Sequence, residues 1–358
     1  MKKLVFTPLL LLTIFINTRL VAQIDNVATD SAYLRTVSII GVGDMMLGTN
    51  YPNTKHLAPN DGANLLDSVR DILMDADITF GNLEGTLAGT KGEVKRCSNP
   101  KLCYAFRSPS HYAKYYKDAG FDLVSIANNH SGDFGAEGRE ITMKTLEEYG
   151  IQYAGLLSCP TTIIEKDGIK YGLAAFAPNS GTVSIKDIEG AKEIVKGLDS
   201  LCDIVIVSFH GGGEGRSKQH VTRETEMFIG ENRGNVYEFS HAVIDAGADI
   251  VFGHGPHVTR AIELYNNSLI CYSLGNFATY DRFSLTAESG VAPIIKVTTD
   301  IKGNFISAQI TPIKQVGEGI PMVDREKQWA LKLIQDLTNE DFPENSLLIG
   351  DDGMVTKK

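Results

Sequence analysis

The sequence lacks the signature motifs of several enzyme classes. It has no G-x-S-x-G nucleophile elbow, although HGGG at residues 210–213 has the composition of an oxyanion loop. GVGDMM at residues 41–46 lacks the third glycine of a dinucleotide-binding fingerprint, and neither a P-loop nor an H-E-x-x-H zinc motif occurs. These absences argue against a serine hydrolase, a dinucleotide-dependent enzyme, a P-loop NTPase and an H-E-x-x-H zinc peptidase.

Beyond its first residues, the chain has no apolar run long enough to span a bilayer. The start, MKKLVFTPLLLLTIFINTRLVAQ, has two lysines, an apolar stretch and an alanine before Gln23, which together predict a cleaved signal peptide over residues 1–22. A retained membrane anchor is the alternative. Cleavage removes three basic residues and changes the formal net charge from −10 to −13, which disfavours nucleic acid and anionic membrane surfaces as partners. We therefore expect an exported protein, periplasmic, cell-surface or secreted, with no transmembrane segment after cleavage.

Cysteine is scarce, with five in 358 residues. Cys97 and Cys103 flank the short segment SNPKL, and they either form a disulfide, as export permits, or remain independent thiols. Cys202 and Cys271 lie beside apolar, strand-like runs and are expected in the core. The odd number leaves at least one free thiol if all pairing stays within the chain.

The first half of the chain alternates short apolar strands with helical patterns. Strands are predicted at residues 36–40, 77–80, 121–127 and 151–155, and helices at residues 64–76, 109–120 and 136–150. This alternation is typical of βαβ units on a largely parallel sheet.

The second half adds hairpins to this pattern. Hairpins are predicted at residues 161–177, 260–274 and 291–313, helices around 188–201 and over most of 223–247, and buried strands at 203–209 and 249–253. The chain has no internal repeat and no Pro/Gly/Ser-rich linker. We therefore predict one α/β domain over residues 36–315, with two mixed sheets packed together and helices outside, and a C-terminal extension over residues 316–358.

Polar side chains follow several predicted strands, at the point where each strand ends. They are Asp44, Asn82, Glu84, Asn128, Asn129, His130, His210, Glu214, His254, His257 and Asn276. Ligands of open α/β sheets bind at the carboxyl ends of the strands, so we expect these side chains to converge. Carboxylate, amide and imidazole groups form the ligand set of a divalent ion such as Mn, Fe or Zn. Each residue alone is more simply a turn, cap or core residue, but the repetition over five loops favours a metal site.

Six blocks of the sequence, in this order, resemble the CapA family. They are GVGDMMLG, DITFGNLEGTL, FRSPSHYAKYYKDAGFDLVSIANNHSGDFG, VIVSFHGGGE, GADIVFGHGPHV and YSLGNF, and they cover roughly residues 36–280. The family is tied to capsule and poly-γ-glutamate synthesis and has the calcineurin-like metallophosphoesterase fold. The resemblance implies a four-layer αββα sandwich with a metal centre at the strand ends.

The resemblance also implies roles for individual residues. The metal ligands would be Asp44, Glu84, Asn129, His210 and His257, and His130 would be the general acid or transition-state donor. From the residues themselves, supporting or substrate-contacting roles are expected for Asn82, Glu214, His254, Asn276 and Arg107, whereas Ser131 and Asp133 are expected to be turn and capping residues. The usual D-x-H opening is Asp44-Met45-Met46 here, and H-P-H is replaced by Gly255-Pro256-His257. A single divalent ion, or a weakly bound pair, is therefore the expected cofactor.

Two functions are compatible with these assignments. In the first, the exported protein hydrolyses a phosphoester with metal assistance and contributes to capsule or poly-γ-glutamate synthesis. In the second, it is a non-catalytic assembly or export factor that binds an anionic surface polymer and works with envelope polymer-synthesis proteins. Residues 91–107 carry five basic residues, Arg107 among them, against Glu93 alone. This segment is either a solvated loop or an attractor of carboxylates and phosphates.

Overall fold

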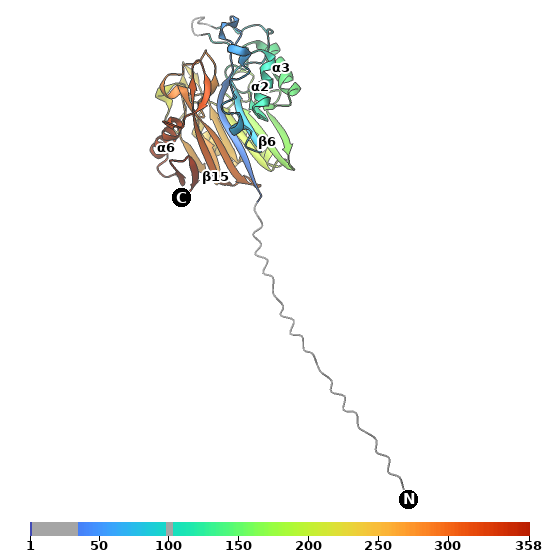
Figure 1. Cartoon of the computed structure of the whole chain (residues 1–358), viewed down its shortest axis with the longest axis vertical. Helices are drawn as coiled ribbons and strands as arrows, with labels where there is room; N and C mark the ends of the chain where they lie inside the picture. Colours follow the sequence, from blue (N-terminus) through green and yellow to red (C-terminus); the bar gives the residue numbers. More distant parts are fainter. Residues whose placement is uncertain (2–34, 98–102) are drawn as a thin grey trace. The chain divides into compact units, whose positions relative to one another are not determined.

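Two mixed β-sheets lie face to face at the centre of the structure (Figure 1). The computed structural model describes Met1, residues 35–97 and residues 103–358, and Arg35–Lys358 form one compact unit. The larger sheet consists of β1 (Thr36–Met46), β2 (Ile78–Leu83), β3 (Leu123–Ser125), β4 (Gln152–Ala154), β13 (Asn276–Thr279), β14 (Val291–Asp300), β15 (Phe305–Val316), β16 (Ile320–Val323), β17 (Leu347–Ile349) and β18 (Met354–Lys357). Its order is β17-β18-β15-β14-β1-β2-β3-β4, with β13 beside β1 and β16 beside β15.

Strands β1 to β4 are parallel neighbours. The connections between them carry α1 (Arg70–Leu73), α2 (Ala113–Asp118) and α3 (Gly135–Glu148), since a parallel pair needs a crossover of this kind. The predicted βαβ rhythm of the first half is thus confirmed. Because these strands share one direction, their carboxyl ends all reach the same edge of the sheet.

The smaller sheet has the order β11-β12-β10-β7-β6-β5. Its strands are β5 (Thr161–Lys166), β6 (Ile169–Phe176), β7 (Ile204–His210), β10 (Ile250–His254), β11 (Ile262–Tyr265) and β12 (Ser268–Cys271). The four central strands are parallel, whereas β5 and β11 join the edges as antiparallel hairpin partners. All three predicted hairpins are present, the third being β14 with β15. Asn266 and Asn267 turn one of them with positive φ, which asparagine tolerates.

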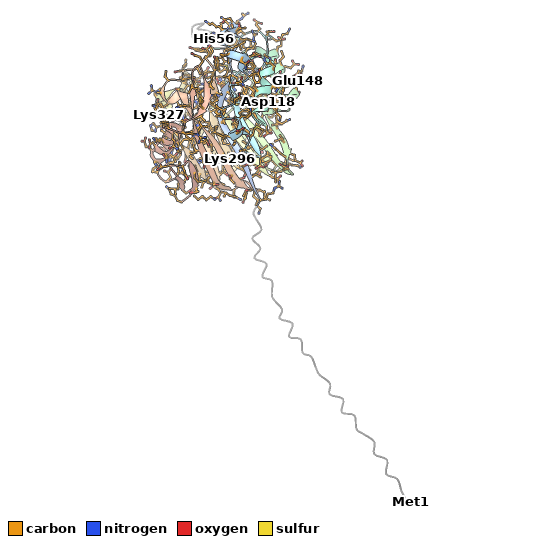
Figure 2. All side chains as sticks on the ribbon, viewed as in Figure 1. Met1, His56, Asp118, Glu148, Lys296 and Lys327 are labelled. Carbon is orange, nitrogen blue, oxygen red and sulfur yellow. A yellow bond between two sulfur atoms is a disulfide. The ribbon has the colours of Figure 1, made fainter. Side chains whose placement is uncertain are left out.

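The molecule is a four-layer αββα sandwich, as predicted, and three apolar layers lie between its helices and sheets. Ile39 and Phe80 of the larger sheet meet Ile206 and Phe252 of the smaller sheet in the central layer. The outer face of the larger sheet packs on α2 and α3. The outer face of the smaller sheet packs on α4 (Ile188–Asp199) and α5 (Val236–Asp245). The charged side chains of Asp118, Glu148 and Lys327 lie outside these layers and are exposed (Figure 2).

Two predicted helices are shorter than expected. Within residues 64–76 only α1 is α-helical, because the preceding residues form successive turns closed by i→i+3 bonds such as Val69 N–H to Leu66 C=O. Leu65, Leu66, Val69 and Leu73 of this stretch are nevertheless buried. Within residues 223–247 only α5 is helical. Ile229 and Gly230 adopt positive φ and turn the chain between β8 (Met227–Phe228) and β9 (Glu231–Asn232).

Residues 316–358 are an integral part of the sandwich, so the boundary predicted at residue 315 falls inside β15. Strands β16 and β18 pair with β15, and β17 pairs with β18. Helix α6 (Trp329–Asp341) places Leu331 and Ile334 in the central layer. The larger sheet therefore includes strands from the last part of the chain.

Two sequence predictions concern membranes and export. The signal peptide predicted over residues 1–22 lies outside the described residues, apart from Met1. Among the helices of residues 35–97 and 103–358, none is both long and apolar enough to cross a bilayer.

The stacked rings of Phe80 and Phe252, with centroids 5.6 Å apart, join the two sheets. Phe252→Ala removes a fully buried ring between them, and we expect it to lower the free energy of unfolding by about 3–5 kcal/mol. Urea unfolding followed by circular dichroism measures this change. Leu157→Ala is the control, since Leu157 is 70% exposed and its truncation should change stability by less than about 0.5 kcal/mol. Equal losses in both variants would contradict the central role of this contact.

Asp249, just before β10, gives the fold a pH dependence. Burial raises the pKa of Asp249 to about 7, despite the hydrogen bond that its carboxylate accepts from Val205 N–H at 2.7 Å. In the unfolded chain an aspartate has a pKa of about 3.9. The folded state therefore binds a proton more tightly, and the stabilisation present at low pH is lost as the pH rises to about 7.

Asp249→Asn keeps an acceptor for Val205 and removes the titration. We expect the unfolding free energy of the wild type to fall relative to that of the variant between about pH 4 and 7, and then to level off. Parallel pH profiles of the two proteins would rule out this assignment. The measurement is urea unfolding in a series of buffers of constant ionic strength.

Candidate metal centre

The carboxyl ends of the parallel strands in both sheets bring the predicted site residues together. In the larger sheet, Asp44 on β1 is in register with Asn82 on β2 and with Asn276 on β13. In the smaller sheet, His210 and His254 are the last residues of β7 and β10 and are in register with one another. Gly43 lets the backbone next to Asp44 approach the backbone of Gly275 closely, because a Cβ at residue 43 would lie 2.0 Å from the Gly275 carbonyl oxygen.

Asp44, Glu84 and His210 form a compact group of metal-ligating side chains. One ligand atom of each lies within 4.8 Å of the others, and all three side chains are buried. Oε1 of Glu84 and both ring nitrogens of His210 have no hydrogen-bond partner within the described residues. Buried polar atoms without partners are costly, and a divalent ion would bind Oε1 of Glu84 and one of the two ring nitrogens of His210. The residues therefore fit the cation that the sequence predicts.

Asn82 holds the two carboxylates of this group. Its side-chain nitrogen donates to Oδ1 of Asp44 at 2.8 Å and to Oε2 of Glu84 at 2.5 Å. Its oxygen accepts from the side-chain nitrogen of Asn128 at 3.0 Å. Burial raises the pKa of Glu84 well above its usual value, and the charge of Asp44 raises it further. Asn82 thus fixes a pair of carboxylates that repel each other, which a cation would relieve.

His257 and Asn129 complete the predicted ligand set from two further loops. Nδ1 of His257 lies 2.8 Å from Oδ2 of Asp44. Burial opposes protonation of His257, but the hydrogen bond and charge of Asp44 outweigh it and raise its pKa. Oδ1 of Asn129 is buried without a partner in the described structure. The side chain of Asn129 lines the adjoining cavity, so an acceptor oxygen is available there.

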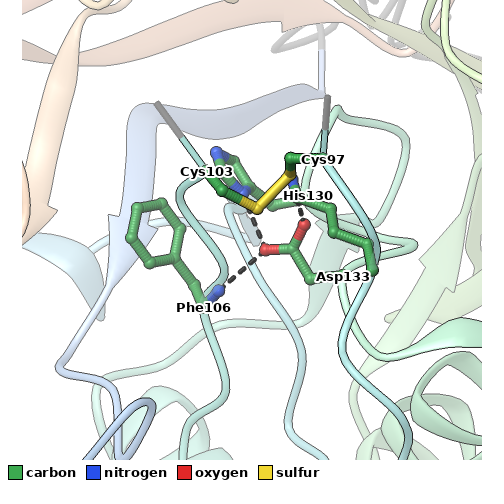
Figure 3. Close-up of a disulfide and its surroundings, with 6 residues drawn as sticks. Cys97, Cys103, Phe106, His130 and Asp133 are labelled. Atoms are coloured by element: carbon green, nitrogen blue, oxygen red, sulfur yellow. Dashed lines mark hydrogen bonds and ion pairs between the residues drawn. A yellow bond between two sulfur atoms is a disulfide. The ribbon is translucent and has the colours of Figure 1, made fainter. Parts of the chain in front are cut away.

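His130 is oriented by Asp133, which the sequence predicted to be only a turn or capping residue. Nδ1 of His130 lies 2.8 Å from Oδ2 of Asp133 (Figure 3). Nε2 of the same ring lies 4.0 Å from Oε1 of Glu84. The same Oδ2 accepts the Phe106 N–H at 2.7 Å, and Oδ1 lies 2.5 Å from Nζ of Lys95. Nothing in the sequence singled out Asp133, because aspartate is a common turn residue. Its i+3 position in the turn that begins at His130 is the signal that identifies it.

The Cys97–Cys103 disulfide connects the two segments that support Asp133 (Figure 3). One segment contributes Lys95 and the other Phe106, whose ring packs on His130 with centroids 4.2 Å apart. Of the two alternatives for these cysteines, the structure has the disulfide. Cys271 is buried, as expected, and Cys202 is half-buried.

A cavity of about 510 Å³ opens beside the metal group. It is lined by predicted site residues, namely Asn129, His130, Glu214 and His257, and by residues that the sequence did not single out, including Tyr104, Phe106, Phe228, Arg233, Arg282 and Phe283. Apart from Phe106, these additional residues lie outside the six blocks that resemble the CapA family. Only the fold shows that they share a cavity.

Three of the remaining predicted residues have other partners. The ring nitrogens of His254 lie 3.1 Å from Val42 C=O and 3.4 Å from the Ser208 hydroxyl. Nδ2 of Asn276 donates to the backbone carbonyls of Ser289 and His257, so Asn276 supports the His257 loop. Arg107 donates through Nε to Asn50 at 3.0 Å and stacks on Phe134. His254 and Arg107 therefore have structural partners, and neither lines the cavity.

Comparison with known proteins gives consistent matches. The family described as bacterial capsule synthesis protein PGA_cap matches residues 38–281. The capsule biosynthesis protein CapA of Bacillus anthracis is 28% identical over 272 residues, which are 70% of this chain and 61% of that protein. The PGA biosynthesis protein CapA of Bacillus subtilis is 25% identical over 316 residues, 84% of this chain and 77% of that protein. The NAD nucleotidase structure from Haemophilus influenzae is 13% identical, with a TM-score of 0.43 over 84% of this chain and 56% of that one.

The donor set makes metal binding the first property to measure. We expect the wild type, dialysed against Mn²⁺, Zn²⁺ or Fe²⁺, to retain metal by elemental analysis. His210→Ala removes a ligand and should weaken binding by more than about 100-fold, beyond the usual effect of a supporting residue.

His220→Ala serves as the control, because His220 is exposed and pairs with Asp341 away from the cavity. Its metal content should match that of the wild type. Equal metal retention by His210→Ala and wild type would refute the proposed ligand group.

Proposed function

Because this chain belongs to the PGA_cap family of bacterial capsule synthesis proteins, we propose that it is an exported, metal-dependent phosphoesterase that acts in the synthesis of a capsule or poly-γ-glutamate. The observation that carries the proposal is the buried group of Asp44, Glu84 and His210 beside a cavity. Oε1 of Glu84 and the ring nitrogens of His210, which can bind a metal ion, have no hydrogen-bond partner within the described residues. His130 borders both the group and the cavity, so a proton donor is present where a substrate would bind.

Asp44, Glu84 and His210 would hold a divalent ion, with Asn129 and His257 as further ligands. Such an ion polarises a phosphoryl oxygen and lowers the pKa of a bound water. Asn82 keeps the two carboxylates in place before the ion arrives. The protein thus supplies a preorganised negative site and does not have to rearrange it during the reaction.

His130 is the general acid in this proposal. Its Nδ1 is occupied by Asp133, which fixes the orientation of the ring and leaves Nε2 for the substrate. The Asp133 carboxylate thus holds the imidazole in one orientation, as a buried aspartate does for a catalytic histidine. A protonated Nε2 can then donate to the leaving oxygen of a phosphoester bound in the cavity.

Binding of an anionic surface polymer without catalysis is the second candidate function. The cavity offers Lys95 and Arg282 beside the aromatic rings of Tyr104 and Phe283, a surface suited to a carboxylate-bearing or phosphate-bearing chain. In this case the protein would be an assembly or export factor that works with other envelope polymer-synthesis proteins. The two functions differ in whether bonds are broken.

Turnover of small phosphoesters tests the first function. We expect the Mn²⁺-, Zn²⁺- or Fe²⁺-loaded protein to hydrolyse p-nitrophenyl phosphate or its diester near neutral pH. His130→Ala should lower kcat by about 10²–10⁴-fold with unchanged metal content, because it removes a general acid and no ligand.

His111→Ala is the matched control, since His111 is an exposed histidine paired with Asp61. Unchanged turnover in His130→Ala would exclude His130 as the acid. A metal-loaded wild type that hydrolyses no ester of a broad panel, yet retains poly-γ-glutamate on a gel-shift assay, would favour the second function.

A further inference from the structure

Two buried arginines near the cavity differ in how their nitrogens are bonded. Arg260 is fully partnered: Nε donates to Lys218 C=O at 2.7 Å, and Nη1 and Nη2 donate to the Glu226 carboxylate at 2.8 and 2.7 Å. Arg233 is 2% exposed and contacts Glu214 through Nη1 at 3.1 Å. Its Nε and Nη2 have no partner among the described residues.

The unpartnered atoms of Arg233 form one edge of the guanidinium. Nε–H and one N–H of Nη2 point in the same direction, with the spacing that matches two oxygens of a carboxylate or phosphate. Glu214 occupies a different nitrogen, so the hydrogen-bonding capacity of this edge is unused within the described residues. An unsatisfied, buried guanidinium is costly, and a ligand that completes its bonds explains why the position holds one.

Backbone hydrogen bonds join Arg233 to the turn that follows His210. Its carbonyl accepts the Gly212 N–H at 3.0 Å, and its N–H donates to Glu226 C=O at 2.9 Å. Gly212 lies two residues after His210, so the arginine is tied to the turn that follows a candidate ligand.

Arg233 also lines the cavity that contains Asn129, His130 and His257. We propose that Arg233 is the oxyanion-binding residue of this cavity and that it takes a phosphoryl or carboxylate group of the substrate through Nε and Nη2. The identity of the substrate rests on the proposed function, but the capture of an oxyanion by Arg233 does not. In a phosphoester substrate, this contact would place the phosphoryl group between Arg233 and the metal ligands.

Anion binding to the Mn²⁺-loaded protein tests the proposal without any turnover. Inorganic phosphate and L-glutamate are titrated separately by isothermal calorimetry into wild type, Arg233→Met, Arg233→Lys and Arg216→Met. We expect Arg233→Met to weaken binding of at least one anion by about 10-fold or more, as for a charge-assisted hydrogen-bonded pair. Arg233→Lys should recover part of the affinity, since it keeps the charge and lacks the paired donors.

Arg216→Met is the control, because Arg216 is an exposed arginine that does not line the cavity. A loss for phosphate alone identifies a phosphoryl site, and a loss for glutamate alone identifies a carboxylate site. Affinities of Arg233→Met equal to those of the wild type for both anions would overturn the proposal. So would the absence of measurable binding of either anion to the wild type.

Stability separates this role from a structural one. Arg233→Met also removes the ion pair with Glu214, so the shift of the unfolding midpoint on addition of an anion, and not the midpoint itself, separates the two roles. The anion that binds the wild type should raise its midpoint and leave that of the variant unchanged. Arg233→Lys provides the same comparison if Arg233→Met does not fold. A wild type that binds anions through Arg233 but hydrolyses no ester would refute the proposed function alone.

Discussion

The stacking of the two sheets is the constraint on which the rest of this molecule depends. Asp44 and Glu84 come from the larger sheet, and His210 and His257 come from the smaller one. They meet because the central apolar layer, with Phe80 against Phe252, holds the carboxyl ends of both sets of parallel strands at one edge. The apolar core therefore sets the distances within a polar site that contains none of the core residues.

The polar site is organised by charge in a medium of low polarity. Two buried carboxylates repel each other, Asn82 donates to both of them, and His257 lies within hydrogen-bonding distance of Asp44. Oxygens and nitrogens at the centre still have no partner within the described residues. A cation would satisfy those of Glu84 and His210, and an anion those of Arg233. The two candidate ligands therefore have opposite charges, as metal-assisted attack on an oxyanion requires.

Local patterns predicted the fold well and the irregular segments poorly. The strand ends carrying Asn82, Asn129 and His210 were recognisable because each follows an apolar run, and the αββα sandwich is confirmed. The helix expected over residues 223–247 was wrong in its first half, where a hairpin at Ile229 and Gly230 forms instead. Arg233 lies just beyond that hairpin, so the pattern offered no reason to select it. Asp133 was overlooked for a similar reason, since a polar residue in a turn is ordinary until its neighbour is known to be His130.

The sequence by itself determined most strands and helices before residue 315, three hairpin turns and the residue types at the strand ends. These properties depend on side-chain periodicity and backbone preference over a few neighbouring residues. The tertiary structure alone decided that Glu84 faces His210, that His254 binds the Val42 carbonyl, and that Arg233 lines the cavity. It also decided that residues 316–358 complete the larger sheet. Such relations join residues far apart in the chain, and only the packing of two sheets on one another brings them within bonding distance.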